Sequence, residues 1–350
     1  MELNIATLSD FVRNAQILFL KGLDSVPAAA RNSGMFRQDM VPDNTGNTRE
    51  YSEIDLEQYA KLKGEDDQAT RAKVQQGYNK IGTLKRIALD IGISYEMRHY
   101  NKYQDVIARL TNLGTLAANR IELDLQHRLT FGSATTYTDM DGISRDISVG
   151  DTLALYSTAH TLRGGGTTTT FRNILANNPQ FSKGGLEGME KLVVENSLNQ
   201  FGEKTVIPYD IIWSTDDPNT VNTIREYLRS TSAPDANNSG VINVYQNKYR
   251  HVILPLVATD AYGSVDSTKA KYWGLASTSN SQAHLGINEE PRLTTPPVAG
   301  NNGEERSTDA WTFGVRAGYF VVIPASLVAV LFKINLRIFT RVTSIIFYIS

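Results

Sequence analysis

The longest periodic segment of the chain is residues 95–131, which read YEMRHYNKYQDVIARLTNLGTLAANRIELDLQHRLTF. Apolar side chains recur there every three or four positions, which is the spacing of one face of an α-helix. A helix of about 36 residues would be about 54 Å long, far beyond the roughly 11–12 residues of an average globular helix. We therefore expect a spine helix to which other elements attach. Its core-facing residues are predicted to be Tyr103, Val106, Leu110, Leu113, Ala117, Ile121 and Leu125.

Sequence signals mark both ends of this helix. Ser94 suits the N-cap position, and Glu96 puts a negative charge in the first turn, where the helix dipole favours it. Gly132 follows the last periodic residue and favours termination of the helix.

Length and composition place the chain among globular proteins. It has 350 residues, 41% of them apolar and 21% charged, so it is neither a disordered chain nor a coiled coil. Lys plus Arg number 35 against 37 Asp plus Glu, and this formal charge of −2 excludes a strongly basic nucleic-acid-binding protein. The absence of Cys excludes disulfides, thiolate metal sites and a Cys nucleophile. The N-terminal run MELNIATLSD has no basic region, so we expect no secretory signal and folding in a reducing cytosol.

The segments that precede the spine helix have little core of their own. Residues 7–22 have the pattern of an amphipathic helix, and residues 23–47 are predicted to be a polar arm that cannot form a core alone and lies on something else. Residues 49–94 alternate weakly around a charged break at Lys63-Gly64-Glu65-Asp66-Asp67, which indicates a long two-stranded hairpin. A hairpin of this kind is marginally stable alone, so we expect its partner to be on another subunit.

Helical and strand signals alternate in the rest of the chain. Asp141-Gly142 is a hairpin-turn signal, and helices are predicted over 186–201 and after the Asp217-Pro218 cap. Strands are predicted over 206–213, 242–245, 252–256, 272–276 and 311–323, with a loop-rich stretch over 277–309.

The C-terminal stretch has two interpretations. Between Arg316 and Lys333 lie 16 uncharged, mostly apolar residues, and Pro324 interrupts them. A membrane-spanning helix needs about 20 such residues. The alternative is buried strand, because apolar and polar residues alternate over 333–338. We favour the strand and expect no membrane partner.

No motif predicts catalysis or metal binding. Gly164-Gly165-Gly166 lacks the Lys-Ser or Lys-Thr of a phosphate loop, and Asp139-Met140-Asp141-Gly142 is followed by Gly150 where a calcium loop needs Glu. The five histidines lack metal-ligand spacing. Ser157 and His160 are close in sequence, but no nucleophile-elbow motif accompanies them. We therefore expect no catalytic residue, cofactor or metal, and a hydrolase that uses Ser157 or His160 stands as an alternative.

Several segments in fixed order resemble the major capsid proteins of tailed bacteriophages, in particular the Mu-like major head proteins. The resemblance covers about residues 50–320. The segments are Gly77-Tyr78, IGISYEM (91–97), DTLALYSTAHTL (151–162), FSKGGLE (181–187), IPYDIIW (207–213), YRHVILPL (249–256) and KYWGL (271–275).

The resemblance implies an α+β fold of the tailed-phage major capsid type. Its parts would be an N-terminal arm (1–48), an extended hairpin called the E-loop (49–94), a P-domain (95–154) with the spine helix over 95–131, an A-domain (155–304), and return strands of the P-domain with a C-terminal tail (305–350). The tail departs from the family pattern, because residues 321–350 are apolar and basic.

The same resemblance implies a non-enzymatic protein that self-assembles into the icosahedral head shell around the phage double-stranded DNA. The expected partners are copies of itself in pentamers and hexamers, portal, scaffold or decoration proteins, and packaged DNA contacted without sequence specificity. The protein would assemble in the host cytoplasm and end in the virion. Alternatives are an encapsulin-type bacterial compartment shell and a membrane-associated assembly factor using residues 317–349. Inter-subunit contacts are expected from hairpin residues Arg49, Glu50, Lys61, Lys63, Glu65, Asp66, Lys73, Tyr78, Lys80 and Lys85.

Overall fold

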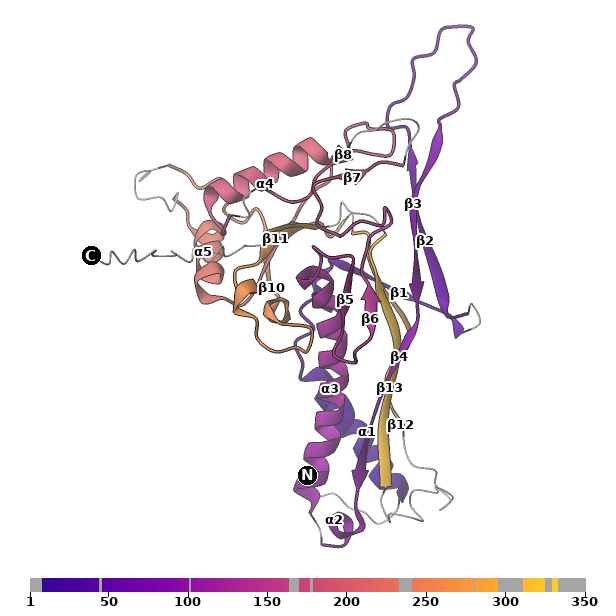
Figure 1. The fold of residues 1–350 in the computed structure, drawn as a ribbon, viewed down its shortest axis with the longest axis vertical. Helices are drawn as coiled ribbons and strands as arrows, with labels where there is room; N and C mark the ends of the chain where they lie inside the picture. The colour runs from indigo at the N-terminus through magenta and orange to yellow at the C-terminus, as the bar shows by residue number, and fades with distance from the viewer. Residues whose placement is uncertain are drawn as a thin grey trace, which may run out of the picture.

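The chain folds into mixed α and β structure, as its sequence predicts. The computed structural model describes residues 8–43, 46–100, 102–163, 170–176, 179–232, 241–279, 281–294, 311–324 and 329–332. Figure 1 shows three regions: an elongated part in which a long helix lies along long strands, a broader α/β part, and a hairpin that projects from the upper right.

The predicted spine helix forms as two helices instead of one. Helix α2 covers Tyr95–His99 and helix α3 covers Tyr103–Thr130, which is 28 residues long. Lys102 lies between them with φ −76° and ψ 52°, outside the helical region. The prediction of one continuous helix over 95–131 is therefore wrong. The apolar period pauses at this point, where His99, Tyr100 and Lys102 are exposed.

The buried face of α3 is the predicted one. Leu110 shares an apolar cluster with Ala15 of helix α1 (Leu8–Asp24) and with Phe313 of strand β13 (Trp311–Val322). Leu113 shares another with Phe19 of α1. Helix α3 therefore packs on both α1 and a sheet. Among the predicted core residues, Val106, Leu110, Leu113, Ala117, Ile121 and Leu125 are buried, and the side chain of Tyr103 lies outside the described residues.

The sheet beneath α3 has four strands in the order β1-β12-β13-β4. Strand β1 (Phe36–Met40) runs parallel to β12 (Ala283–Thr294) at one edge. Strand β13 pairs antiparallel with β12 and with β4 (Lys85–Ile93). The sheet thus joins the N-terminal arm, the segment before the spine helix and the last third of the sequence.

Two of these strands lie where the sequence predicts none. The predicted loop over 277–309 contains β12, and this prediction is wrong because residues 283–287 are buried, so the strand lacks the alternation that would reveal it. The predicted polar arm over 23–47 contains β1, an edge strand with mostly exposed side chains. Its polar composition conceals a strand whose stability comes from β12.

The α/β part is built on a second four-stranded sheet, in the order β10-β9-β11-β14. Helix α4 (Lys183–Asn196) and helix α5 (Pro218–Arg229) bury apolar side chains against it around Trp273. The Asp217 carboxylate accepts a hydrogen bond from the Thr220 amide at 3.0 Å, which confirms the predicted cap of α5. The strands are β9 (Ile211–Ser214), β10 (Arg250–Ile253), β11 (Trp273–Ala276) and β14 (Ala329–Phe332).

Short elements complete this part of the fold. The turn signal at Asp141-Gly142 is confirmed, because Gly142 has φ +74° between the paired strands β5 (Thr136–Thr138) and β6 (Ser144–Asp146). The strand predicted over 242–245 does not form, apart from a single bridge at Ile242. The remaining elements are β7 (His160–Thr161), β8 (Thr170–Phe171) and the 3-10 turns Arg31–Ser33, Pro255–Ala258 and Ser267–Lys269.

The projecting hairpin is shorter than the sequence predicts. It consists of β2 (Thr48–Leu56) and β3 (Val74–Thr83), joined by a loop over 57–73 that extends beyond the body in Figure 1. The prediction of one two-stranded excursion over 49–94 is wrong in its last third, because β4 pairs with β13 along its whole length. Leu84 alone separates β3 from β4, so the hairpin continues directly out of the main sheet.

The strand interpretation of the C-terminal stretch is confirmed as far as the structure describes it. Residues 311–322 form β13, and the alternation predicted over 333–338 lies outside the described residues. Within the described part of the chain, no helix combines the length and the apolar content that crossing a bilayer requires.

We expect Leu113→Asp to prevent folding of the subunit. Leu113 is fully buried between α1 and the sheet, and burying an unpaired carboxylate costs several kcal/mol, a large part of the about 5–15 kcal/mol that stabilises a domain. Asn112 is exposed on the other side of α3, so Asn112→Asp should be tolerated. Soluble yield and thermal melting of the two variants test this, and equal yields would contradict the buried face assigned to α3.

Candidate functional site

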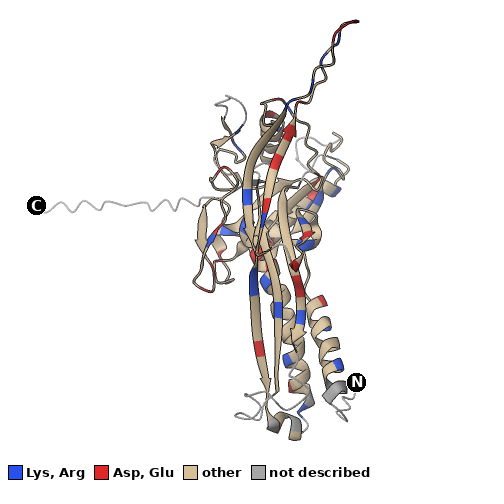
Figure 2. Cartoon of the chain, turned by 90° about the vertical axis from the view of Figure 1, so that its right-hand side faces the viewer, with Lys and Arg blue, Asp and Glu red and all other residues tan. Residues whose placement is uncertain are grey.

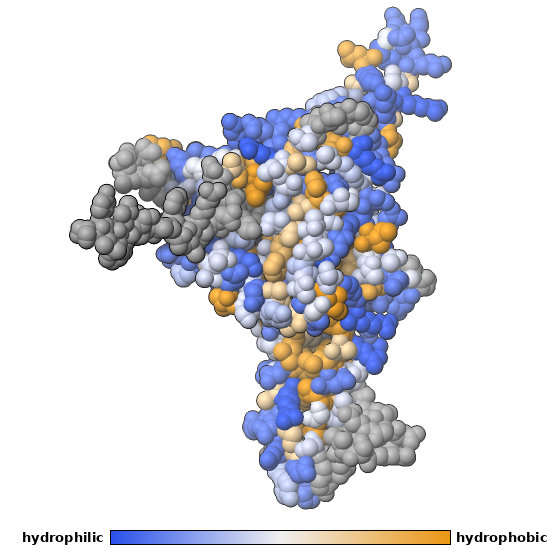
Figure 3. All heavy atoms as spheres, viewed as in Figure 1, coloured by the Kyte–Doolittle hydropathy of each residue, from blue (hydrophilic) through white to orange (hydrophobic). Residues whose placement is uncertain are grey.

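The β2–β3 hairpin exposes apolar side chains that the chain itself does not cover. Ile54, Leu56 and Val74 are 65%, 57% and 65% exposed, and Leu56 is paired with Val74 across the two strands. The loop adds Tyr59 and Leu62, both exposed. Figure 3 shows apolar residues scattered along this projection among hydrophilic ones. Grouped exposed apolar side chains in a folded protein mark a surface for interaction.

A second exposed apolar surface lies beside α3. Leu116, Leu89 and Met140 are 50%, 45% and 44% exposed and line a shallow groove of about 670 Å³ between α3, β4 and the β5–β6 turn. Figure 3 shows apolar residues gathered in this narrow middle part of the molecule. Apolar side chains are also exposed elsewhere among the described residues, for example Val206, Ile242 and Val265.

Midway along the hairpin loop lies a turn with three consecutive carboxylates, which we call the acidic turn (Gly64–Asp67). The Asp67 amide donates a hydrogen bond to the Gly64 carbonyl at 3.3 Å. The side chains of Glu65 and Asp66 form no hydrogen bond or ion pair with any described residue. Figure 2 shows charged residues concentrated along the projecting loop. Lys61 lies on the same loop, 3.7 Å from Glu57.

A β-bulge in strand β2 directs the Glu53 carboxylate toward the body of the protein. Ser52 pairs with Asn79 and Ile54 with Gln76, so Glu53 lies opposite two residues, Gly77 and Tyr78. A Cβ atom at Gly77 would lie 2.5 Å from Oε2 of Glu53 and 2.9 Å from Nε2 of Gln200. Because position 77 carries no side chain, the carboxylate of Glu53 and the side-chain amide of Gln200 have space to form their hydrogen bond.

Polar contacts attach the hairpin to the α/β part, at what we call the polar junction (Glu53, Asp55, Gly77, Arg163 and Gln200). Gln200 donates from Nε2 to Oε2 of Glu53 at 2.7 Å and from its backbone amide to Oδ2 of Asp55 at 2.8 Å. Arg163 donates from Nη1 to the Gly77 carbonyl at 2.9 Å, and its amide donates to Oε1 of Gln200 at 2.9 Å. Gln200 thus attaches strand β2 to the body, and Arg163 attaches strand β3.

Glu53 is the titratable member of this junction near neutral pH. Burial raises the pKa of the Glu53 carboxyl to about 7, and the neighbouring Asp55 and Asp151 carboxylates add to the increase. The hydrogen bonds from Gln200 and from the Tyr78 backbone oppose it. The neutral form of Glu53 is therefore favoured when the hairpin is docked on the body.

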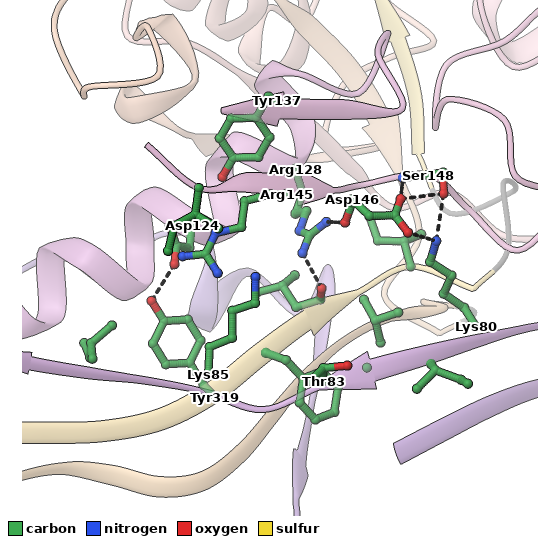
Figure 4. Close-up of a pocket in the computed structure, with 18 of the residues that line it drawn as sticks. Lys80, Thr83, Lys85, Asp124, Arg128, Tyr137, Arg145, Asp146, Ser148 and Tyr319 are labelled. Atoms are coloured by element: carbon green, nitrogen blue, oxygen red, sulfur yellow. Dashed lines mark hydrogen bonds and ion pairs between the residues drawn. The ribbon is translucent and has the colours of Figure 1, made fainter. Parts of the chain in front are cut away.

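A cavity of about 470 Å³, the basal pocket, lies where the hairpin leaves the sheet (Figure 4). Lys80 donates to Oδ2 of Asp146 and to Oγ of Ser148, both at 2.7 Å. Arg128 donates to the carbonyl oxygens of Asp146 and Val321, at 3.0 and 2.6 Å. The charged lining residues are Lys80, Lys85, Arg86, Arg128, Arg145, Asp124, Asp141 and Asp146.

The structure separates the predicted contact residues into four groups. Lys80 and Lys85 lie in the basal pocket, and the Tyr78 hydroxyl lies at the polar junction, 2.7 Å from Oγ1 of Thr161. Arg49 and Glu50 lie at the start of β2, where Arg49 donates to the Met40 carbonyl at 3.2 Å. The residues on the loop or at its end are Lys61, Lys63, Glu65, Asp66 and Lys73.

Sequence reasoning missed Glu53, Gln200 and Arg128. Their partners are distant in sequence, as in the contact between Glu53 and Gln200, and no local pattern announces such a contact. Gly77 within a strand was the available signal, because an isolated glycine in a strand indicates a bulge or a close approach.

His160 is a buried structural histidine. Its Nδ1 lies 2.7 Å from Oδ2 of Asp151, and its Nε2 lies 3.2 Å from the Leu155 carbonyl oxygen. The Ser157 hydroxyl accepts a hydrogen bond from the Ala159 amide, and within the described residues none joins Ser157 to His160. Both imidazole nitrogens are thus engaged by groups other than a nucleophile. Metal-ligand clustering of His, Asp and Glu is also absent from the part of the chain that the structure describes.

Comparisons with known proteins found structural likeness without sequence matches. No protein-family model matches the chain, and no curated protein sequence does. A virus-like particle from Pyrococcus furiosus is similar with a TM-score of 0.46 and 10% identity, over 92% of this chain and 98% of that one. A chain of the Gordonia phage Cozz is similar with a TM-score of 0.48 and 12% identity, over 86% and 85%. A chain of the procapsid of bacteriophage JBD30 is similar with a TM-score of 0.46 and 14% identity, over 95% and 77%.

Docking of the hairpin should weaken as pH rises. The pKa of Glu53 is about 7 in the folded chain against an ordinary value of 4.5, so the stability due to its neutral form is complete below pH 4.5 and is lost as pH rises to 7. We expect a loss of roughly 2–3 kcal/mol over this interval. Glu53→Gln should remove most of it, as measured by urea denaturation and by hydrogen exchange of hairpin amides at pH 5 and pH 8.

The matched control is Glu50→Gln, which changes an exposed carboxylate on the same strand. This variant should keep the pH dependence of the unmodified protein. An unchanged pH dependence in Glu53→Gln would show that Glu53 is not the group responsible.

Proposed function

We propose that this chain is a structural, non-enzymatic protein that assembles with copies of itself into a closed shell. The observation that carries the proposal is the β2–β3 hairpin, which projects from the body and exposes Ile54, Leu56 and Val74 to solvent. A two-stranded hairpin without a covered apolar face is marginally stable in water. Packing against a neighbouring copy would bury this face.

The shell we propose is the head of a tailed bacteriophage of the Mu-like type. Support comes from the sequence segments that resemble the major head proteins of that group, from the run over 91–97 that leads into the spine helix to the run over 271–275 in β11. The proposed form is a set of pentamers and hexamers that enclose double-stranded DNA in the virion. Portal, scaffold or decoration proteins would be its further partners, and assembly would take place in the host cytoplasm.

The charge of the chain suits a wall that touches packed DNA without holding it. A formal charge of −2 leaves no excess of cations to neutralise many phosphates. Each phosphate contact strengthens binding and makes it depend on salt. A wall of this composition would let DNA enter and leave.

The proposed parts follow the order of the elements. Helix α1 and strand β1 would belong to the N-terminal arm, and the hairpin and its loop would be the E-loop. Helix α3 with the rest of the main sheet would be the P-domain, and the sheet with α4 and α5 would be the A-domain. The hairpin residues named from the sequence as inter-subunit contacts remain the proposed contacts, with Lys80 and Lys85 at the base and Glu65 and Asp66 at the end.

Assembly of the purified chain tests the proposal. We expect sedimentation velocity and negative-stain microscopy to find closed shells, or pentamers and hexamers, at micromolar concentration. A protein that stays monomeric at every concentration, with and without crowding agents, would contradict the proposed function.

Replacing residues 57–73 with Asn-Gly should abolish assembly and leave the subunit folded. Leu56 and Val74 are directly paired, so a two-residue turn can close the shortened hairpin. The loop contributes little to the body beyond the contacts of Gln58 with Glu203 and Thr205, at 3.0 and 2.9 Å. We expect a change in unfolding free energy within about 1 kcal/mol, because surface changes of this kind are usually small.

The control for this experiment is a replacement of the same loop by a Gly/Ser sequence of equal length. It keeps the reach of the loop and removes its side chains, so loss of assembly there too would assign the effect to the side chains. A shortened variant that assembles normally would remove the loop from the interface.

A further inference from the structure

The basal pocket holds cations that the chain does not neutralise. Of its lining carboxylates, Asp146 is paired with Lys80 at 2.7 Å, Asp141 with Arg120 at 2.8 Å, and Asp124 accepts a hydrogen bond from the Tyr319 hydroxyl at 2.6 Å. The three cations Lys85, Arg86 and Arg128 have no carboxylate within 4.0 Å among the described residues. The lining therefore carries unneutralised positive charge.

Three cationic side chains converge in this space. In Figure 4 the side chains of Lys85 and Arg145 lie near Asp124, and that of Arg128 lies between them and Asp146. Arg145 is also paired with Asp139. Burial and the nearby guanidinium groups of Arg145 and Arg128 lower the pKa of the Lys85 ammonium. Arg128 is bonded to carbonyl oxygens, which satisfy its N–H groups without cancelling its charge. An incoming carboxylate would relieve this repulsion.

The acidic turn has the complementary chemistry. Glu65, Asp66 and Asp67 follow one another on an exposed turn, and the fully exposed Leu62 lies three residues before Glu65, with Lys63 and Gly64 between them. The basal pocket offers cations together with apolar side chains, among them Ile143 and Phe320. The pocket therefore offers partners both for carboxylates and for an apolar side chain.

We propose that the basal pocket receives the acidic turn of a second copy of this chain. The inference rests on the proposed shell function and names the two surfaces of one contact within it. Glu65 and Asp66 of one copy would pair with Lys85 and Arg86 of the next. Close opposite charges across an interface fix the register of the partners and speed their encounter.

The acidic turn cannot reach the pocket of its own chain. Val74 lies six residues before Lys80 on an extended strand, a distance of about 20 Å, and the turn extends further outward in Figure 1. A DNA duplex is a poorer occupant. Part of the lining is apolar, which a phosphate backbone does not match. A second copy carries both the charge and the apolar side chain that the pocket fits.

Charge reversal on each surface, alone and together, tests the contact. The pocket variant carries Lys85→Glu and Arg86→Glu, the turn variant carries Glu65→Lys and Asp66→Lys, and the combined variant carries all four substitutions. The matched control carries Lys191→Glu and Arg229→Glu, which make the same charge change at exposed positions on α4 and α5. The measured quantity is the fraction of protein that sediments as shells, with thermal melting of every variant.

We expect the pocket variant and the turn variant each to lose about tenfold or more of the shell fraction, as for reversed charge pairs at other interfaces. The combined variant should recover most of it, and the control should assemble like the unmodified protein. If the pocket variant melts early, the neutral changes Lys85→Gln and Arg86→Gln replace it. Their loss of shells should then be partial and should not be repaired by the turn substitutions.

Two results would overturn the contact while leaving the shell function in place: a pocket variant that assembles normally, or a combined variant that stays as defective as its parents. A pocket variant that assembles normally but loses binding to a short DNA duplex would instead make the pocket a nucleic-acid site. An unmodified protein that never assembles would overturn the shell function and the contact together.

Discussion

The packing of α3 between α1 and the main sheet is the constraint on which the other parts depend. Gly114 of α3 and Gly22 of α1 permit it, since a Cβ at Gly114 would lie 2.2 Å from the Phe19 carbonyl oxygen and one at Gly22 would lie 1.9 Å from that of Thr111. Backbone atoms meet there with no side chain between them. This close approach fixes the apolar face of α3 over β13, and β13 in turn fixes β4.

The direction of the hairpin follows from that packing. Strand β4 is paired with β13 over its whole length, and Leu84 alone connects it to β3, so the main sheet sets where the hairpin starts. Beyond its base the hairpin is attached through hydrogen bonds of the polar junction, whose partners water can replace. A rigid origin and a replaceable polar attachment would suit the contact with a neighbouring copy that we propose for the hairpin.

Local signals in the sequence identified the elements whose stability is local. The buried face of α3, the Asp217 cap of α5 and the turn at Gly142 follow from spacing, capping chemistry and the glycine requirement for positive φ. The apolar run of β13 was also recognised, because its residues carry the strand pattern themselves.

The elements that the sequence did not reveal are those defined by distant partners. Strand β1 is polar and depends on β12, and β12 contains Gly286 and Pro291, which weaken any strand signal. The break between α2 and α3 lies beside exposed residues, where the apolar spacing pauses. The candidate site also depends on distant partners. Only the fold brings together Glu53 and Gln200, or the cations Lys85, Arg128 and Arg145 of the basal pocket. The charged loop was visible in the sequence, but the surface that complements it was not.

The position of β1 in the main sheet has a consequence for how the chain is made. Phe36 pairs with Ala283, a separation of about 250 residues, so β1 leaves the ribosome long before its partner strand exists. Contacts of such separation form slowly, since a long loop has to close before they contribute any stability. Helices α1 and α3 are complete much earlier and can pair while the sheet that covers them is still missing. During synthesis the apolar face of α3 is therefore open to chaperones and to neighbouring nascent chains, and the last third of the chain closes it.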